Sequence, residues 1–274
     1  MPSDWVGFWD DAPTVYVSAQ HKSVHYQSIA KDIVRHVPQG GARVLDFGCG
    51  EALSADLIAA KCVELYLCDA AETVRAALKT RFAGVREISV VAPDSLAAAI
   101  PAGSLDLIVV NSVAQYLTPE RLGENIKAWM PLLRPGGRIL LADIIPPDVG
   151  AVADAGALLK LAARNGFLLD ALVGLGRIYF SNYRTLRGAL GLTKYAEDQF
   201  IEHLNQCGLA ARRVYPNLGH NQRRMAFLAS IGGGLNARPP NSSPGFRRCE
   251  FFCAPEARGS AGCSFRPEAT LVVA

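Results

Sequence analysis

Short apolar runs alternate with helix-like stretches over most of the first 145 residues. Patterns typical of buried strands occur at 43–47, 63–69, 85–91, 105–112 and 137–145. Apolar residues at helical spacing predict helices at 51–62, 71–83 and 121–133, and a further helix at 23–37 with Ser23 as its cap. Strands that alternate with helices of this length indicate βαβ units and a parallel sheet covered on both faces.

The alternation breaks after residue 145 and returns near the end of the chain. A helix is expected at 197–208, and strands at 210–216 and 223–231. These two strands are too close for a crossover helix, so we expect an antiparallel hairpin at the edge of the sheet. The prediction is an α/β three-layer sandwich with a seven-stranded, mostly parallel sheet that ends in this hairpin.

Composition excludes several classes of protein. The chain has 274 residues, 50% of them hydrophobic and 19% charged, which excludes wholesale disorder. The net charge of +3 is small and forms no obvious stripe, so no nucleic-acid partner is expected. No apolar run reaches the length of about 18 residues that a spanning helix needs, and no signal peptide is evident. The seven cysteines suggest no disulfide framework, so we expect a cytoplasmic protein.

Three regions are expected along the chain. Residues 1–42 form an N-terminal cap segment and helix, 43–231 form the main domain, and 232–274 form a flexible C-terminal tail. Within the main domain, 146–195 is predicted to be a substrate or lid insertion. It gathers aromatic and basic residues that suit an anionic, aromatic or lipid-like small molecule, although they could also form a dimer contact or a lipid patch: Arg177, Tyr179, Phe180, Tyr183, Arg184, Arg187 and Tyr195.

The sharpest motif is the glycine-rich turn after the first expected strand. Asp46 ends that strand, Gly48 and Gly50 form the turn, and Asp69 ends the second strand. Glycines allow a ligand to approach the backbone, and an acid at the second strand end can accept hydrogen bonds from ribose hydroxyls. A tight turn without a ligand is the structural alternative. Leu53 stands where a dinucleotide-binding turn needs a third small residue, which counts against NAD.

These residues resemble the class I S-adenosylmethionine-dependent methyltransferases, a family with a Rossmann-like three-layer fold. Val44 to Gly50 matches the first family motif, with Ala52 as a departure at the third small position, and the run from Leu132 to Leu141 resembles the turn into strand five. The resemblance implies S-adenosylmethionine as cofactor. It assigns the methionine part to Asp46, Gly48, Cys49 and Gly50, the ribose to Asp69 and Ala70, the adenine to Asp94 and Ser95, and a further cofactor contact to Asn111.

The residue that would take a proton from the acceptor is not evident from the sequence. Candidates are His21 and His25 in the N-terminal segment and Tyr116 after the fourth strand, where Gln115 could also face the substrate. His36, His203 and His220 are expected on the surface, the last in a solvated turn. No ligand spacing for a metal is visible, so no metal is assigned.

We therefore expect a methyltransferase that acts on a small molecule, with an oxygen, nitrogen or carbon acceptor left open. The alternatives are an NAD-type oxidoreductase and a non-catalytic accessory protein that binds the cofactor. The oligomeric state stays open at this point.

Overall fold

Runs of buried apolar residues form the seven strands of one sheet. The computed structural model describes residues 7, 16–179 and 191–232, and leaves out the side chains of 177–179. All described residues belong to one unit of the chain. The strands are β1 (Ala42–Phe47), β2 (Cys62–Cys68), β3 (Ile88–Val91), β4 (Leu105–Asn111), β5 (Leu133–Ile144), β6 (Leu209–Val214) and β7 (Met225–Ile231).

The strand order confirms the predicted sheet. It runs β3-β2-β1-β4-β5-β7-β6, with β1 to β5 parallel and β7 antiparallel to both of its neighbours. The final hairpin lies at the edge as expected, with its second strand on the inside. The order reverses between β1 and β4, and an open parallel sheet binds ligands beyond the carboxyl ends of its strands at such a point.

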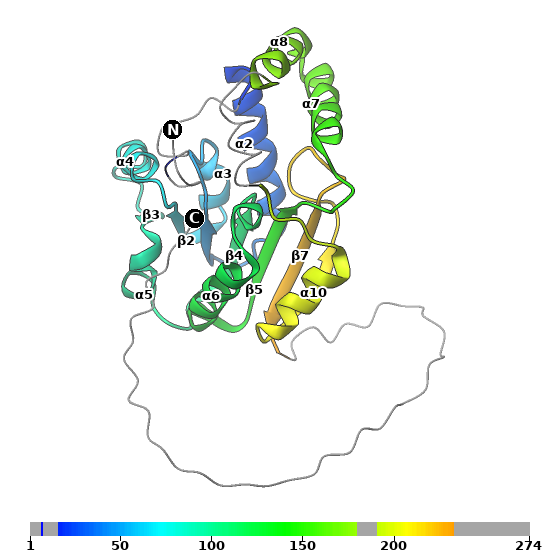
Figure 1. Cartoon of the computed structure of the whole chain (residues 1–274). Helices are drawn as coiled ribbons and strands as arrows, with labels where there is room; N and C mark the ends of the chain where they lie inside the picture. Colours follow the sequence, from blue (N-terminus) through cyan, green and yellow to red (C-terminus); the bar gives the residue numbers. More distant parts are fainter. Residues whose placement is uncertain (1–6, 8–15, 180–190, 233–274) are drawn as a thin grey trace, which may run out of the picture. The chain divides into compact units, whose positions relative to one another are not determined.

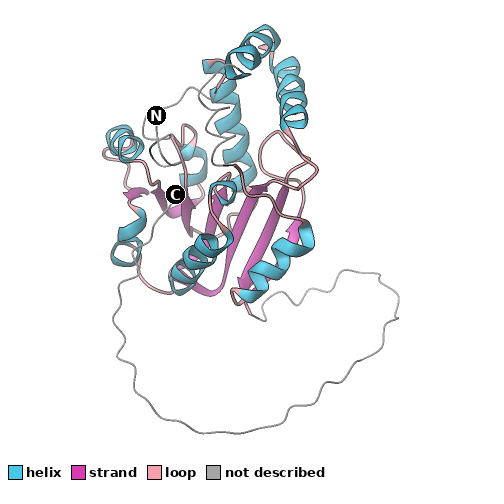
Figure 2. Cartoon of the chain, viewed as in Figure 1, coloured by secondary structure: helices cyan, strands magenta, loops and turns pink. Residues whose placement is uncertain are grey.

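Helices cover both faces of the sheet (Figure 2). Their bounds are α2 (Ala19–Val34), α3 (Ala55–Ala59), α4 (Glu72–Arg81), α5 (Leu96–Ala99), α6 (Pro119–Trp129), α7 (Ala151–Asn165), α8 (Leu168–Tyr179) and α10 (Glu197–Gln206). The short 3₁₀ turns are η1 (Pro93–Ser95), η2 (Ala114–Tyr116) and η3 (Met130–Leu132). Residues of α5, α6 and α10 share one buried cluster with the sheet, and residues of α2, α3 and α4 share another. The three-layer arrangement is therefore confirmed.

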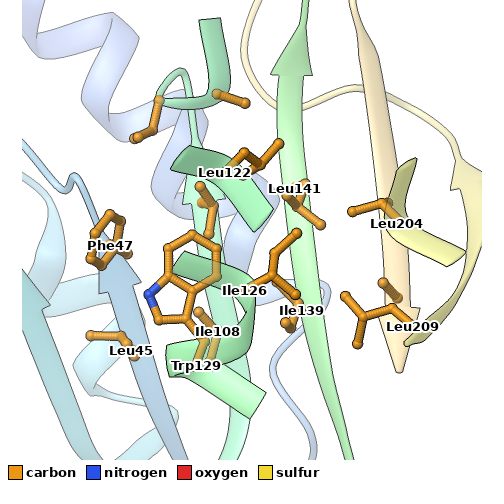
Figure 3. Close-up of a cluster of buried hydrophobic side chains, with 14 of the residues drawn as sticks. Leu45, Phe47, Ile108, Leu122, Ile126, Trp129, Ile139, Leu141, Leu204 and Leu209 are labelled. Atoms are coloured by element: carbon orange, nitrogen blue, oxygen red, sulfur yellow. The ribbon is translucent and has the colours of Figure 1, made fainter. Parts of the chain in front are cut away.

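Alternate residues of the central strands supply the two buried clusters. Leu45 and Phe47 of β1 belong to the cluster with α6. Val44 of the same strand belongs to the opposite cluster, with residues of α2. Figure 3 shows the first cluster, in which the fully buried Trp129 lies against Phe47 with ring centroids 4.8 Å apart. Burial on both faces fixes the strand register, because a slip of one residue would exchange the faces.

Several expected boundaries are wrong, among them the end of the helix expected at 121–133, which is Trp129, and the start of the strand expected at 137, which is Leu133. Three others have a clear local reason. The first helix begins at Ala19, because the Ser18 hydroxyl caps it by accepting from the His21 N–H at 3.2 Å. The helix expected at 51–62 is shortened to α3, because Ala52 has a φ of 43°, which is outside the right-handed helical region. The strand expected from residue 85 begins at Ile88, because Val85 donates its N–H to the Phe82 carbonyl in a turn.

The insertion after β5 contains two helices. Figure 1 shows α7 and α8 beyond the end of the sheet at which β5 terminates, next to the N-terminal end of α2. Leu158, Ala162, Phe167 and Ala171 form a third buried cluster there. Residues 180–190, with Phe180, Tyr183, Arg184 and Arg187, lie outside the described residues, as does the expected tail with its three cysteines. In the described parts of the chain no helix is long and apolar enough to cross a membrane.

Candidate active site

The glycine-rich turn requires glycine at both of its marked positions. Gly48 and Gly50 have φ values of 73° and 58°, in the left-handed region that favours glycine. A Cβ on Gly48 would lie 2.2 Å from Cγ2 of Val113, and one on Gly50 would lie 2.8 Å from the hydroxyl of Tyr26. The turn is held to β2 because the N–H groups of Gly48 and Cys49 both donate to the Cys68 carbonyl, at 2.8 and 3.1 Å.

Ala52 occupies the third small position with a strained backbone. Its φ of 43° is left-handed, and a residue with a Cβ there loses roughly 1 kcal/mol relative to glycine. The turn nevertheless forms, as expected from the sequence. The N–H of Glu51, the residue before Ala52, donates to the Tyr26 hydroxyl at 3.0 Å. A side chain of α2 therefore closes the turn from outside the motif.

Asp69 connects the turn to the end of β2. Its Oδ2 accepts from the Gly50 N–H and its Oδ1 from the Ala71 N–H, both at 2.9 Å. Burial raises the pKa of the Asp69 carboxyl, and these hydrogen bonds oppose that rise. Each carboxylate oxygen accepts one bond here and has a further lone pair, so the group can still receive two donors. The structure thus places Asp69 and Ala70 directly beside Gly50.

Asp46 and Cys49 are buried next to Asp69. Burial, together with the nearby charge of Asp69, raises the pKa of Asp46 to about 7. Burial also raises the pKa of the Cys49 thiol, and the charges of Asp46 and Asp69 add to that rise. The thiol therefore stays protonated and is not a nucleophile. Two carboxyl groups in one desolvated site favour a bound cation.

Asp94 and Ser95 lie on η1, directly after β3. Both are exposed, and the Ser95 hydroxyl donates to Oδ1 of Asp94 at 3.0 Å. Because β3 is the neighbour of β2, this pair follows Asp69 along the same edge of the sheet. The expected cofactor residues of the first three strands therefore meet at one edge.

At the ends of β4 and β5 the backbone is strained. Ser112 and Asp143 have φ values of 59° and 64°, and the Ser112 hydroxyl donates to Oδ2 of Asp143 at 2.7 Å. The Asp143 N–H in turn donates to Oδ1 of Asn217 at 3.0 Å. Left-handed non-glycine residues persist where the surroundings fix them, and they concentrate at functional sites.

Asn111 and Gln115 each leave a buried oxygen unpaired. Asn111 Nδ2 donates to the Ser112 hydroxyl at 3.3 Å, whereas Oδ1 of Asn111 and Oε1 of Gln115 have no partner among the described residues. Tyr116, next along η2, is half-buried. A buried polar atom without a partner requires an explanation, and an absent ligand is one.

Three histidines from distant parts of the chain meet above this edge. His21 and His25 lie one turn apart on α2, and His220 comes from the segment between β6 and β7. Their ring centroids form a triangle with sides of 6.2, 6.0 and 6.3 Å. The rings of Tyr16, Tyr26 and Phe167 surround them, at 5.5 Å from Tyr16 to His25, 5.7 Å from Tyr26 to His25, and 5.5 Å from Phe167 to His21.

Burial keeps these imidazoles neutral. Burial, with a smaller contribution from the neighbouring histidines, lowers the pKa of His25 to about 3 and that of His21 to about 4. Nδ1 of His25 and Nε2 of His21 are buried without a hydrogen-bond partner among the described residues, while Nδ1 of His21 accepts from the Val17 N–H. The cluster therefore offers neutral ring nitrogens, with the carboxylates of Asp143 and Asp154 acting only on His220.

The expectation of a solvated turn for His220 is wrong. His220 is half-buried and burial lowers its pKa, because the segment that carries it folds back on α2, where the Gly219 N–H donates to Oδ2 of Asp32 at 2.8 Å. Beside it, Arg224 donates to Asp143 at 2.6 Å and to Asp154 at 3.0 Å. These two carboxylates raise the pKa of the Arg224 guanidinium against the effect of burial, which fixes its charge.

Tyr195 lies in the core, which corrects its expected place in a wall of aromatic residues. It is 6% exposed, and its ring lies 4.8 Å from that of Phe200 on α10. The Tyr195 N–H donates to the Ile145 carbonyl at 3.0 Å, so this end of the insertion runs along the end of β5.

Sequence reasoning assigned no role to three side chains that close the site: Asp143, Asp154 and Arg224. Each acts through a partner far away in the chain, as the ion pair of Arg224 with Asp154 shows. No local pattern in the sequence indicates such pairs. For Asp143, its place at the end of a predicted strand was the one usable signal. In the described part of the chain no group of three or more metal-ligating side chains has the geometry to hold a metal ion.

Comparison with known proteins gives a consistent family. The family model of a methyltransferase domain matches residues 44–137. A protein of Bacillus thuringiensis (strain Al Hakam), described as an uncharacterized methyltransferase, is 27% identical over 159 residues, covering 55% of this chain and 72% of that protein. Proteins of Bacillus mycoides and Bacillus cereus, also described as uncharacterized methyltransferases, are likewise 27% identical to this chain over 159 residues.

Solved structures share the fold. Magnesium protoporphyrin IX methyltransferase from Synechocystis PCC 6803 with bound SAH superposes with a TM-score of 0.50 at 16% identity, covering 84% of this chain and 96% of that one. A SAM-dependent methyltransferase from Leishmania major gives 0.50 at 16% identity, covering 82% and 80%. At such identities the likeness establishes the architecture of the domain.

Proposed function

We propose that the chain, whose residues 44–137 match a methyltransferase domain, is a class I S-adenosylmethionine-dependent methyltransferase that binds this cofactor on its glycine-rich turn and methylates a small molecule. The observation that carries the proposal is the pair of carboxyl groups of the buried Asp46 and the half-buried Asp69, beside Gly50. They suit a cofactor with a sulfonium and an ammonium group. The same pair would repel the pyrophosphate of NAD, which disfavours the oxidoreductase alternative.

The proposed contacts follow the edge of the sheet. Asp46, Gly48, Cys49 and Gly50 hold the methionine part, and Asn111 at the end of β4 lies near its reactive end. Asp69 receives both ribose hydroxyls on its remaining lone pairs, next to Ala70. Asp94 and Ser95 meet the adenine, one strand further along. When bound, S-adenosylmethionine supplies a methyl group already activated on sulfur, so the protein contributes alignment and exclusion of water.

The histidine cluster is proposed to orient the acceptor. Because burial lowers the pKa of both His25 and His21, neither imidazole is a strong base, and the proton that the acceptor loses as its bond to the methyl carbon forms passes to solvent. A hydroxyl or amine acceptor can instead donate a hydrogen bond to a neutral ring nitrogen of these side chains. Their unpaired nitrogens, Nδ1 of His25 and Nε2 of His21, support this role. Tyr116, on η2 at the end of β4, is proposed to orient the acceptor.

A small acceptor suits the surroundings of these nitrogens. Aromatic rings enclose the histidines on several sides, with Tyr16 at 5.3 Å and Phe167 at 5.5 Å from the His21 ring centroid. Such rings stack on flat or apolar groups. A long polymer segment would have to displace them, whereas a small molecule can lie between them.

The first experiment separates cofactor binding from methyl transfer. Calorimetry should show saturable binding of S-adenosylhomocysteine, and Asp69→Ala should weaken it by about 1 to 3 kcal/mol, the scale of lost hydrogen bonds to a charged group. Asp56→Ala, which removes an exposed acid of α3, is the matched control and should leave the affinity unchanged.

The second experiment follows a labelled methyl group. Protein is incubated with labelled S-adenosylmethionine and the low- and high-molecular-weight fractions of an extract from the source organism. We expect label in a compound of the low-molecular-weight fraction. Label confined to protein or nucleic acid would contradict the small-molecule acceptor, and binding without any transfer would favour the non-catalytic alternative.

A further inference from the structure

A chain of hydrogen bonds ends on Asn111, the last residue of β4. Nη1 of Arg224, directly before β7, donates to Oδ2 of Asp143 in β5 at 2.6 Å. The Ser112 hydroxyl donates to the same oxygen at 2.7 Å, and Nδ2 of Asn111 donates to the Ser112 hydroxyl at 3.3 Å. The chain therefore joins the ends of β4 and β5 to the segment that precedes β7.

The chemistry of these groups fixes the direction of every bond. A guanidinium has donors only, and a carboxylate accepts only. The single proton of the Ser112 hydroxyl is therefore committed to Asp143, so towards Asn111 this hydroxyl can only accept. Asn111 must present its amide nitrogen to Ser112, and the amide oxygen consequently turns away from Ser112.

The surroundings hold this arrangement in place. The Arg224 side chain is 13% exposed, and its Nη2 donates to Oδ1 of Asp154 on α7 at 3.0 Å. Ser112 keeps its left-handed φ of 59° while its N–H donates to the Ala142 carbonyl at 3.1 Å. Left-handed residues other than glycine persist where the surrounding structure determines them, and they concentrate at functional sites. The orientation of the Asn111 amide is therefore built into the fold.

The amide oxygen that turns away from Ser112 needs a donor. Oδ1 of Asn111 is buried and has no hydrogen-bond partner among the described residues. Val110 pairs with Phe47 in the sheet. Asn111 therefore comes level with Gly48, the first glycine of the turn. A buried oxygen of this kind is satisfied when a ligand on the turn brings a hydrogen-bond donor to it.

The strand order identifies that donor. Under the proposed function the adenine lies at β3 and the ribose at β2, both on one side of β1, whereas β4 lies on its other side. The group that reaches Asn111 therefore belongs to the methionine part. The ammonium supplies the hydrogen-bond donors of that part, since the carboxylate only accepts and the sulfonium carries no hydrogen on sulfur. The buried carboxyl group of Asp46 on β1 favours a cation at the same place.

We propose that Ser112, Asp143 and Arg224 are positioning residues, which hold Asn111 with its Oδ1 toward the ammonium of the cofactor. The inference rests on the proposed function, because it takes the cofactor to be S-adenosylmethionine. It gives three side chains outside the glycine-rich turn a share in selecting the amino-acid end of the cofactor. Since Arg224 also binds Asp154 of α7, the insertion and the cofactor site belong to one network.

Two ligands that differ in their amino-acid part test the proposal. S-adenosylhomocysteine carries the ammonium, whereas methylthioadenosine keeps the adenosine and the sulfur and lacks the amino-acid part. In calorimetric titrations of the full chain, Ser112→Ala should weaken binding of S-adenosylhomocysteine by about tenfold, near the lower end for a hydrogen bond to a charged group. It should leave the affinity for methylthioadenosine unchanged. Asn111→Ala should give the same pattern.

The combined variant shows whether Ser112 acts through Asn111. If it does, Ser112→Ala with Asn111→Ala should bind S-adenosylhomocysteine no more weakly than Asn111→Ala alone, because the two effects are then not additive. Ser104→Ala is the matched control. It removes a hydroxyl at the other end of β4, where Ser104 donates to the Pro101 carbonyl at 2.6 Å, and it should leave both affinities unchanged.

A second variant guards against a loss of folding. Thermal melting of Ser112→Ala is compared with that of the unchanged protein. If Ser112→Ala melts early, Ser112→Gly takes its place, because glycine also lacks the hydroxyl and suits the left-handed φ at this position. The same difference between the two ligands is expected for it.

The outcomes separate this inference from the proposed function. Failure of the unchanged protein to bind S-adenosylhomocysteine would contradict the proposed function and the inference together. If it binds, three results would overturn the positioning proposal alone. Ser112→Ala could weaken both ligands equally, or it could leave S-adenosylhomocysteine binding unchanged, so that Oδ1 of Asn111 faces the methyl acceptor instead. The losses of the two single variants could also add in the combined variant.

Discussion

The glycine-rich turn and the histidine cluster hold ionisable groups in opposite ways. At the turn, burial raises the pKa of Asp46 and Asp69, so the carboxyl groups resist ionisation. In the cluster, burial lowers the pKa of His21 and His25, so the imidazoles resist protonation. The carboxyl groups of the first region would be stabilised by a cation, and a neutral ring nitrogen of the second can accept a hydrogen bond. The difference agrees with our proposal that a cationic cofactor binds at one region and a methyl acceptor that donates a hydrogen bond binds at the other.

The largest expected effect comes from the charge pairs that support the histidine side. Arg224→Met should lower the free energy of unfolding by about 3 to 5 kcal/mol, because it leaves the partly buried carboxylates of Asp143 and Asp154 without their cation. Arg121→Met, in the exposed pair with Glu124, should change it by less than about 0.5 kcal/mol. Denaturant titration measures both. Equal losses of unfolding free energy in the two variants would show that the ion pairs of Arg224 stabilise the fold no more than an exposed pair does.

Asp46→Asn should alter stability and cofactor binding in opposite directions. The folded-state pKa of Asp46 is raised to about 7, so its contribution to stability is complete at low pH and is lost as the pH rises through 7. At pH 8 the neutral variant should therefore be more stable than the unchanged protein by about 2 to 4 kcal/mol, and near pH 4 the two should converge.

The same variant should bind S-adenosylmethionine more weakly at pH 8, since it lacks the carboxylate that faces the cation. In the unchanged protein the affinity should fall by up to about tenfold between pH 8 and pH 6, as Asp46 takes up a proton. Asp56→Asn should show neither effect. A stabilised variant with unchanged affinity would remove Asp46 from the cofactor site.

The close approach at the turn gives a smaller effect. Gly48→Ala should lower the free energy of unfolding by about 2 to 3 kcal/mol, because a left-handed alanine also meets Val113. Gly84→Ala is the matched control, since its φ of 85° is also left-handed but nothing lies within 4 Å of the added Cβ. It should lose about 1 kcal/mol. Similar losses in both variants would mean that Val113 moves aside.

The smallest effect concerns the pH dependence of the histidine side. The folded-state pKa of His25 is lowered to about 3, so the unfolded chain binds more protons below the ordinary value of 6.5, and stability decreases as the pH falls from 6.5 toward 3. Replacement of His25 by Gln should recover about 1 to 2 kcal/mol of this loss at pH 5 and change little at pH 8. An unchanged slope between pH 7 and pH 5 would contradict the burial of a neutral His25.

Much of the fold could be predicted because its signals are local. Each central strand is a short apolar run, and the hairpin followed from the short distance between the last two strands. The boundaries that failed depend on single backbone states, such as the left-handed Ala52 or the Ser18 cap. A pattern of apolar residues carries no information on these.

The cofactor side could be predicted further than the acceptor side for the same reason. Asp46, Gly48, Gly50 and Asp69 lie within 24 residues, and their mutual contacts follow from strand order. The histidine cluster joins α2 to a segment almost 200 residues away, as the contact of Gly219 with Asp32 shows. His220 therefore looked like an isolated turn residue, and its partners became visible only in the folded chain.

The central claim is that the glycine-rich turn binds a cationic adenosyl cofactor. Parallel calorimetric titrations of the unchanged protein at pH 8 with S-adenosylmethionine and with NAD test it most directly. The account predicts saturable one-to-one binding of S-adenosylmethionine and no measurable heat with NAD. Saturable binding of NAD without binding of S-adenosylmethionine would contradict it.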